Sequence, residues 1–208
     1  MTLIRHDHRA TCALRRLGAT AALLCVVTTI AVGARTDDSE WQPTVTVRED
    51  AGVYSVAARF AVPGRPAIAL AVLTDYERIP QFMPGVETSV VIERRAARAV
   101  IEQEAVSRLM MFKKRVYLLL EIIEGPDTLR FRDRSGRSFA RYEGRWHLCE
   151  GNHGTWIAYE LTAQPAFDVP EFLLKRLLKR DAVQMIDGLR REILRVASAE
   201  SAVTRTSR

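Results

Sequence analysis

Cysteine is scarce in this chain of 208 residues, which contains only three. Cys12 and Cys25 lie in the first 34 residues, which leaves Cys149 alone in the remainder. If the first segment is removed, no disulfide can form within the chain. A domain of about 160 residues must then be stable through its hydrophobic core. We expect Cys149 to be a small apolar residue on a strand.

The sequence also lacks the short motifs of common enzyme classes. It contains no nucleophile elbow, H-E-x-x-H motif, P-loop or G-x-G-x-x-G fingerprint. His147, Cys149 and His153 lie within seven residues, but their spacing matches no common zinc pattern. We therefore predict no metal site and no cofactor. Catalysis by scattered pocket side chains stays open, because it would leave no such motif.

Residues 1–34 have the pattern of an export signal. Four arginines, from Arg5 to Arg16, precede an uncharged stretch, Leu17–Ala34, which ends in small residues. The alternative is an uncleaved anchor, because the stretch is just long enough to span a bilayer. We predict an exported protein, periplasmic or secreted, or one anchored to the inner membrane by residues 17–34.

Removing this segment halves the net charge. The whole chain has 31 basic and 25 acidic residues, a net charge of +6. Without the four Arg and one Asp of residues 1–34, 27 basic and 24 acidic residues remain, a net charge of +3. The sequence pI of about 9.6 is therefore a weak argument for nucleic acid, and we predict no nucleic-acid partner.

Most of the remaining chain has the alternation and turn chemistry of antiparallel strands. Gly125-Pro126-Asp127 and Ser135-Gly136 are typical turn sequences between them. The predicted strands are Thr44–Arg48, Val53–Phe60, Val86–Arg94, Arg98–Val106, Lys113–Glu124, Thr128–Arg134, Phe139–Leu148 and Thr155–Thr162.

Two short helical segments follow the first strands, and one long helix follows the last. Pro66 suits the first position of a helix over Ala67–Thr74, and a helical turn is expected within Asp75–Gly85. From about Pro170 to Ala199, apolar residues recur at three- and four-residue steps, which predicts one buried stripe. These residues are Leu174, Leu177, Leu178, Met185, Ile186, Leu189, Ile193 and Val196.

This order of elements predicts an α+β fold with an antiparallel sheet. A sheet of this length curves, and only the C-terminal helix is long and apolar enough to fill its concave face. We predict one domain over residues 41–199 and a frayed or disordered tail over residues 200–208.

Four segments together resemble the START-like (SRPBCC) superfamily, and within it the polyketide cyclase/dehydrase and coenzyme-Q-binding group. They are Leu73–Val86, Gly144–Leu148, Gly154–Leu161 and the final helix that begins at Pro170. The resemblance spans about Val53–Val196. It implies the helix-grip fold, in which a curved sheet holds the C-terminal helix around a hydrophobic cavity. It does not imply one function, because the superfamily includes lipid carriers, quinone binders and aromatase/cyclases.

We predict that the cavity binds a hydrophobic small molecule or lipid. The candidate ligand-binding residues are Tyr76, Phe82, Met83, Phe112, Tyr117, Leu119, Phe131, Arg141, Trp146, Tyr159, Leu174, Leu177 and Met185. An error of one residue in strand phase would exchange inner and outer side chains.

Two segments have two interpretations each. Tyr76–Gly85 is either a lip over the cavity mouth or a loop whose aromatic side chains belong to the core. Leu109–Phe112 precedes three basic residues and is either a strand end or a membrane-surface contact.

Two alternatives to a binding protein remain. An aromatase/cyclase-type enzyme acting on a polyketone-like substrate would need Arg141 buried beside Tyr159. A partner-binding module would have a filled core.

Overall fold

The computed structural model describes residues 42–109, 112–152 and 154–206. Its strands are β1 (Thr44–Asp50), β2 (Val53–Val62), β3 (Val86–Arg95), β4 (Arg98–Leu109), β5 (Phe112–Glu124), β6 (Thr128–Asp133), β7 (Phe139–Gly151) and β8 (Gly154–Pro165). They form one antiparallel sheet in the order β1-β2-β8-β7-β6-β5-β4-β3. The first hairpin thus pairs with the last strand, where Phe60 lies opposite Ile157. Every predicted strand is present, with ends that differ by a few residues.

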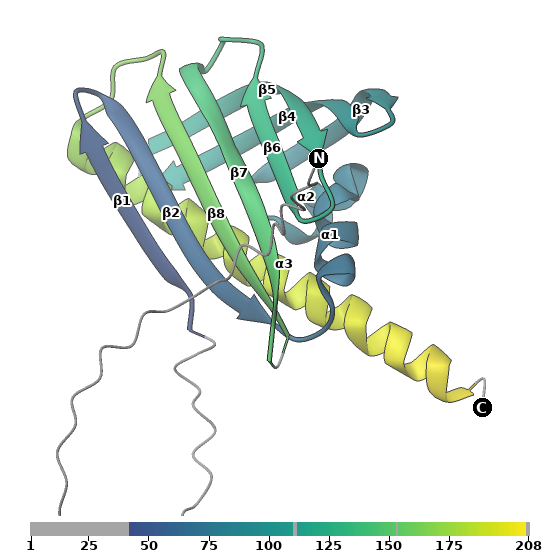
Figure 1. The fold of residues 1–208 in the computed structure, drawn as a ribbon. Helices are drawn as coiled ribbons and strands as arrows, with labels where there is room; N and C mark the ends of the chain where they lie inside the picture. The colour runs from purple at the N-terminus through teal and green to yellow at the C-terminus, as the bar shows by residue number, and fades with distance from the viewer. Residues whose placement is uncertain (1–41, 110–111, 153, 207–208) are drawn as a thin grey trace, which may run out of the picture. The chain divides into compact units, whose positions relative to one another are not determined.

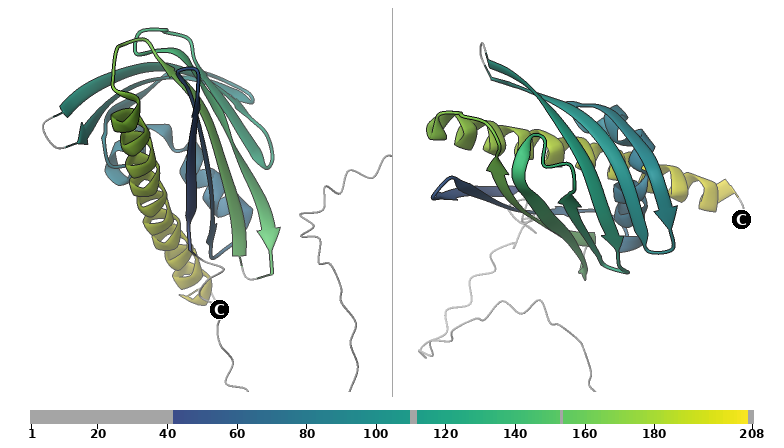
Figure 2. Two further views of the ribbon diagram at one scale, coloured as in Figure 1. Left: turned by 90° about the vertical axis from the view of Figure 1, so that its left-hand side faces the viewer. Right: turned by 90° about the horizontal axis from the view of Figure 1, so that it is seen from above.

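The helices lie on the concave side of this curved, unclosed sheet (Figure 1). Helix α1 (Pro66–Thr74), the 3-10 turn η2 (Tyr76–Arg78) and α2 (Ile79–Phe82) connect β2 to β3. Helix α3 (Glu171–Thr206) follows β8. Figure 2 shows the sheet bending over α3 and the short helices. The predicted helix-grip fold is confirmed.

Helix α3 is longer than the sequence predicted. We expected it to end near Ala199, but it continues to Thr206, while residues 207–208 lie outside the described chain. The segment Ala199–Ala202 contains good helix formers and neither Gly nor Pro, so nothing in it ends the helix. Loss of the apolar stripe after Val196 removes the packing but not the helix.

Helix α3 has two halves that pack differently. Ile186, Leu189 and Ile193 are fully buried against the core that contains Phe60 and Ile157. The earlier apolar residues, from Leu173 to Met185, face a space that the sheet does not fill. The second half of α3 therefore anchors the helix to the sheet, and the first half is left as a wall.

Gly188 allows the Phe82–Pro84 segment to lie directly on α3. A Cβ atom added at Gly188 would lie 2.0 Å from the carbonyl oxygen of Phe82 and 3.1 Å from Cδ of Pro84. Phe82 is the last residue of α2, and Pro84 belongs to the short connection between α2 and β3, so the helix surface must be flat at this point.

We predict that Gly188→Ala destabilises the protein by roughly 1–3 kcal/mol, because the methyl group displaces this connection. In an exposed helix, the same substitution stabilises by about 1 kcal/mol. Urea unfolding of both proteins measures the difference in the free energy of unfolding. Arg191→Ala, at an exposed position of α3 outside the cavity, is the control and should change little. A gain in stability for Gly188→Ala would contradict the close contact.

Candidate ligand-binding site

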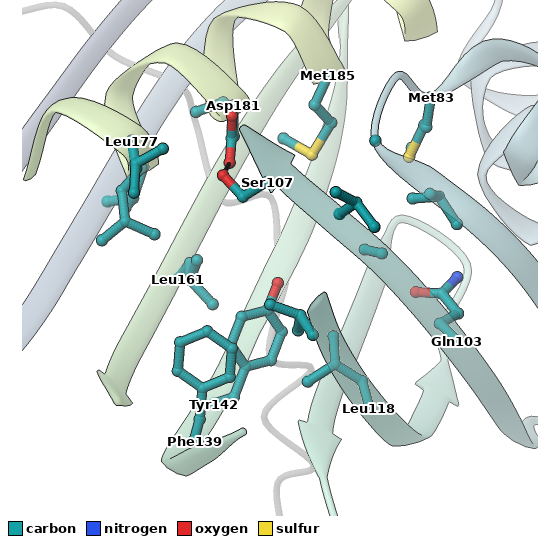
Figure 3. Close-up of a pocket in the computed structure, with 18 of the residues that line it drawn as sticks. Met83, Gln103, Ser107, Leu118, Phe139, Tyr142, Leu161, Leu177, Asp181 and Met185 are labelled. Atoms are coloured by element: carbon teal, nitrogen blue, oxygen red, sulfur yellow. Dashed lines mark hydrogen bonds between the residues drawn. The ribbon is translucent and has the colours of Figure 1, made fainter. Parts of the chain in front are cut away.

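A cavity of about 610 Å³ lies between the concave face of the sheet and the first half of α3 (Figure 3). This volume falls within the roughly 300–1,000 Å³ of typical ligand pockets. Side chains from β2, from β4 to β8, from the short helices, from the loop before β3 and from α3 form its wall. The apolar residues of the wall include Ile101, Val116, Leu118, Leu120, Ile122, Leu161, Leu173, Leu174, Leu177, Leu178 and Met185.

Aromatic side chains form one continuous part of this wall. The ring centroids of Trp146 and Tyr159 are 4.3 Å apart, and those of Phe139 and Tyr142 are 4.9 Å apart. Phe131 links the two pairs, since its ring lies 6.0 Å from that of Tyr142 and 6.2 Å from that of Tyr159. The cluster provides a large, rigid apolar surface with hydroxyl groups at defined points.

The charged residues of the wall belong to its opening. Lys113, Lys114 and Asp168 are exposed, and the side chains of Arg180 and Asp181 keep 33% and 40% of their surface in solvent. The ammonium group of Lys114 lies 3.9 Å from the centre of the Phe167 ring. The opening is therefore polar and hydrated, whereas the interior is largely apolar.

One hydrogen bond joins the two sides of this opening. The Ser107 hydroxyl on β4 donates to Asp181 Oδ2 on α3 at 2.5 Å (Figure 3). Arg180 also donates to the carboxylate of Asp181, at 2.9 Å. These contacts hold the end of β4 against the first half of the helix.

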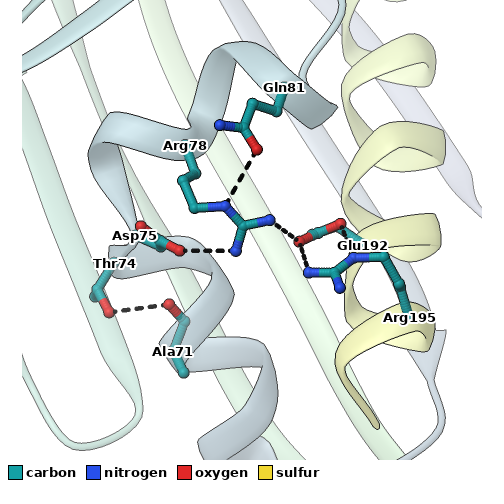
Figure 4. A network of polar contacts seen from close by, with 7 residues as sticks. All are labelled: Ala71, Thr74, Asp75, Arg78, Gln81, Glu192 and Arg195. Carbon is teal, nitrogen blue, oxygen red and sulfur yellow. Dashed lines mark hydrogen bonds and ion pairs between the residues drawn. The ribbon is translucent and has the colours of Figure 1, made fainter. Parts of the chain in front are cut away.

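A second polar network holds the η2–α2 segment on α3 (Figure 4). Arg78 donates to Asp75 at 3.2 Å and to Glu192 Oε1 at 3.0 Å. Arg195 donates to both carboxylate oxygens of Glu192, at 2.6 and 2.8 Å. Because the Glu192 side chain is only 10% exposed, its charge depends on these two guanidinium groups.

Tyr76 fixes the same segment to the sheet, at the end of β5. Its hydroxyl donates to Glu124 Oε1 at 2.7 Å, and Arg94 lies over its ring and pairs with Glu124 at 3.1 Å. Burial, followed by the bond to Glu124, raises the pKa of the Tyr76 hydroxyl well above its ordinary range. Tyr76 thus lines the cavity as a neutral, anchored side chain. Tyr76 and Met83 line the cavity and also pack on the core, which fits the interpretation of Tyr76–Gly85 as a loop whose side chains belong to the core. The lip over the cavity mouth stays a prediction.

Comparison with known families decides the family of this chain. The family described as "polyketide cyclase / dehydrase and lipid transport" matches residues 62–190, which is more than half of the chain. The chain belongs to this family. The predicted resemblance is therefore confirmed for the polyketide cyclase/dehydrase group. No comparison tests the coenzyme-Q-binding part of that prediction.

Solved structures of this family type share the fold. TTHA0849 from Thermus thermophilus is 26% identical, with a TM-score of 0.59 over 67% of this chain and 97% of its own. A STAR-related lipid transfer protein from Xanthomonas axonopodis is 16% identical, with a TM-score of 0.57 over 72% and 98%. An aromatase/cyclase from Streptomyces sp. R1128 is 12% identical, with a TM-score of 0.59 over 69% and 94%. The last two likenesses show the fold alone. No curated protein matches the chain.

Eight of the candidate residues lie in the cavity wall of this family member. They are Tyr76, Met83, Phe131, Trp146, Tyr159, Leu174, Leu177 and Met185. Their placement fits the predicted role, and contact with a ligand stays a prediction. Phe82 packs against the core without lining the cavity. The side chain of Phe112 lies outside the described residues.

Three candidate residues face the other side of the sheet, which corrects the predicted strand phase. On β5, the side chains that line the cavity are Val116, Leu118, Leu120 and Ile122, so Tyr117 and Leu119 point outward. Tyr117 bonds to Glu102 at 3.2 Å on that outer face. Arg141 is exposed and pairs with Glu143, outside the cavity and away from Tyr159.

Several wall residues were absent from the candidate set. Gln103 and Ser107 lie on the inner face of β4, and Phe139 and Tyr142 lie on β7 (Figure 3). The β4–β5 hairpin carried a usable signal, because Glu102 and Glu104 mark the outer face of β4. Gln103, between them, must then point inward, where it donates to Ser89 at 3.0 Å.

The remaining predictions concern metals and membranes. His147 is exposed and lies 3.3 Å from the Thr128 hydroxyl, while His153 lies outside the described residues. Among described residues, no group of three metal-ligating side chains occurs. Likewise, no helix within 42–109, 112–152 and 154–206 combines the length and apolar character of a membrane span. Residues 17–34 and 110–111, on which the membrane predictions depend, lie outside the described chain.

We predict that Glu192→Gln lowers the free energy of unfolding by about 1–2 kcal/mol at pH 7. The hydrogen bond from Arg195, with added attraction from both arginines, lowers the pKa of the Glu192 carboxyl below its ordinary 4.5. A depressed folded-state pKa stabilises the fold above the unfolded-state value, and the effect is lost as pH falls through the folded-state pKa.

Urea unfolding at pH 7 and at pH values below 4.5 tests whether the stabilisation by the Glu192 charge is lost in acid. The difference between wild type and Glu192→Gln should be present at pH 7 and should shrink in acid. Glu143→Gln is the control, because its ion pair with Arg141 is exposed and contributes little. An equal difference at both pH values would show that the charge of Glu192 is irrelevant.

Proposed function

We propose that the protein is an exported carrier that binds a hydrophobic small molecule or lipid between its sheet and α3. The observation that carries this proposal is the cavity of about 610 Å³, whose interior is apolar and whose charged residues lie at the opening. The family description, which names lipid transport, supports the same class of ligand.

The energetics of this site favour apolar ligands. Affinity would come mainly from burial of apolar surface, at about 25 cal/mol per Å². Side chains such as Leu118 and Leu161 offer no hydrogen bond, so most of a ligand's surface must be apolar as well. Exposed lysines at the opening, Lys113 and Lys114, could meet an anionic surface during ligand exchange. We retain the membrane-surface contact of the neighbouring Leu109–Phe112 as part of the proposal.

A cyclase acting on a polyketone-like substrate is the second candidate. It is favoured by the Tyr142 and Tyr159 hydroxyls in the cavity wall and by the aromatase/cyclase among the structural neighbours. The cation that this reaction class was expected to use, Arg141, lies on the outer face. Without that cation beside Tyr159, the wall supports binding better than cyclisation.

We predict that Leu118→Trp weakens ligand binding and that Leu119→Trp does not. The two residues are neighbours on β5, but Leu118 lines the cavity and Leu119 faces outward. A tryptophan at 118 fills ligand space, so affinity should fall by roughly tenfold, since less apolar surface is buried. Circular dichroism checks that both variants fold.

The measurement is native mass spectrometry of wild type and both variants, purified from the protein's own host. Wild type and Leu119→Trp should carry a ligand, and Leu118→Trp should be mostly empty. Wild-type protein that is consistently empty, and that also ignores panels of lipids and quinones, would defeat the proposal. Conversion of a polyketone, without retention, would favour the cyclase.

Export is tested separately, because the cavity says nothing about location. If residues 1–34 are a cleaved signal, the mature protein should begin at Arg35 and appear outside the cytoplasm. N-terminal sequencing after cell fractionation measures both. An intact N-terminus in the membrane fraction would indicate the anchor, and an intact soluble cytoplasmic protein would exclude export.

A further inference from the structure

Two tyrosine hydroxyl groups in the cavity wall retain hydrogen-bonding capacity for a ligand. Tyr142 on β7 and Tyr159 on β8 interact with each other through their hydroxyls. No backbone or carboxylate oxygen of the described residues accepts a hydrogen bond from either of them. Figure 3 shows the Tyr142 hydroxyl directed into the space between the sheet and α3. The pair therefore differs from Tyr76, whose hydroxyl is fixed by Glu124.

Packing fixes the position of both rings. The rings of Phe139 and Phe131 pack against the ring of Tyr142, with centroids 4.9 Å and 6.0 Å away. Trp146 and Phe131 hold Tyr159 in the same way, at 4.3 and 6.2 Å. Because the rings cannot turn away, the hydroxyls are preorganised for a ligand.

Both hydroxyls remain protonated at physiological pH. Burial raises the pKa of Tyr142 to about 12 and that of Tyr159 well above its ordinary value. The interaction with Tyr159 lowers the pKa of Tyr142, whereas the interaction with Tyr142 raises that of Tyr159. Each hydroxyl therefore carries a proton that it can donate to an acceptor.

No charged side chain accompanies this pair in the buried part of the wall that the structure describes. The charged lining residues, such as Lys113 and Asp181, are at least partly exposed at the opening. A charged group placed beside Tyr142 would thus lose its hydration, and the carboxylates of Asp133 and Asp181, which act on the Tyr142 hydroxyl, would repel an anion there. A neutral oxygen on an apolar ligand would meet no such penalty.

We propose that the Tyr142 hydroxyl donates a hydrogen bond to a neutral oxygen, such as a carbonyl, carried by an otherwise apolar and uncharged ligand. This inference rests on the proposed function and specifies its ligand class. The packing of its ring on Phe139 and Phe131 orients the donor, and the aromatic cluster excludes water. The site thereby prefers an oxygenated ligand over a hydrocarbon of the same length and over one with a charged buried end.

The test compares 2-undecanone with undecane in wild type and in Tyr142→Phe. Each is titrated against a neutral fluorescent probe, N-phenyl-1-naphthylamine, bound in the cavity. The ratio of the two affinities is formed for each protein, so that the different solubilities of the two ligands cancel between proteins. Loss of one neutral hydrogen bond should reduce the preference for the ketone by about five- to tenfold. Tyr142→Phe keeps the ring, so its packing with Phe139 is retained.

Tyr117→Phe is the matched control, because it removes a hydroxyl from the outer face of the same sheet. Its affinity ratio should equal that of wild type. If wild type binds both compounds and Tyr142→Phe leaves the ratio unchanged, the hydrogen bond is excluded while the carrier function stands. If wild type binds neither the probe nor either compound, the proposed function fails as well.

Discussion

The packing of α3 on the concave face of the sheet is the interaction on which the rest of the structure depends. Ile186, Leu189 and Ile193 are fully buried there, and they fix one half of the helix firmly. The other half continues in the same straight line, while the sheet curves away from it (Figure 2). The cavity is the space that remains, so binding and stability arise from different parts of one helix.

Close packing of the helix–turn segment around η2 and α2 is the second requirement for this arrangement. Gly188 lets Phe82–Pro84 lie on the helix surface, and Glu192 joins that segment to α3 through Arg78. Tyr76 makes the third attachment, to Glu124 on β5. With these contacts in place, the cavity has a fixed inner end, and Ser107 and Asp181 define its opening. The site is a preformed hollow with one polar region in its aromatic wall, as expected of a binding site for hydrophobic ligands.

Much of the fold could be predicted from periodicity and turn chemistry. The strands, the short helices and the long apolar-striped helix are all present, because each depends on local sequence. The end of α3 was placed too early, since the apolar stripe stops near Val196 while the backbone stays helical to Thr206. The end of the apolar stripe marks where the helix stops packing against the sheet. A helix segment without Gly or Pro can continue beyond that point.

The candidate site was only partly predictable. Alternation by itself determined that β5 has two sets of side chains. Arg115 and Glu121 share a face with Tyr117 and Leu119, which marks that face as outer, whereas Val116, Leu118, Leu120 and Ile122 form an unbroken apolar set. The pairing with β4 agrees, since Gln103 lies opposite Leu118 and Glu102 opposite Leu119. By contrast, only the tertiary structure decided that Tyr142 and Tyr159 meet, because their meeting depends on the register of two strands and the curvature of the whole sheet. Local sequence specifies which elements form, but which side of a curved sheet becomes a cavity depends on contacts between distant residues.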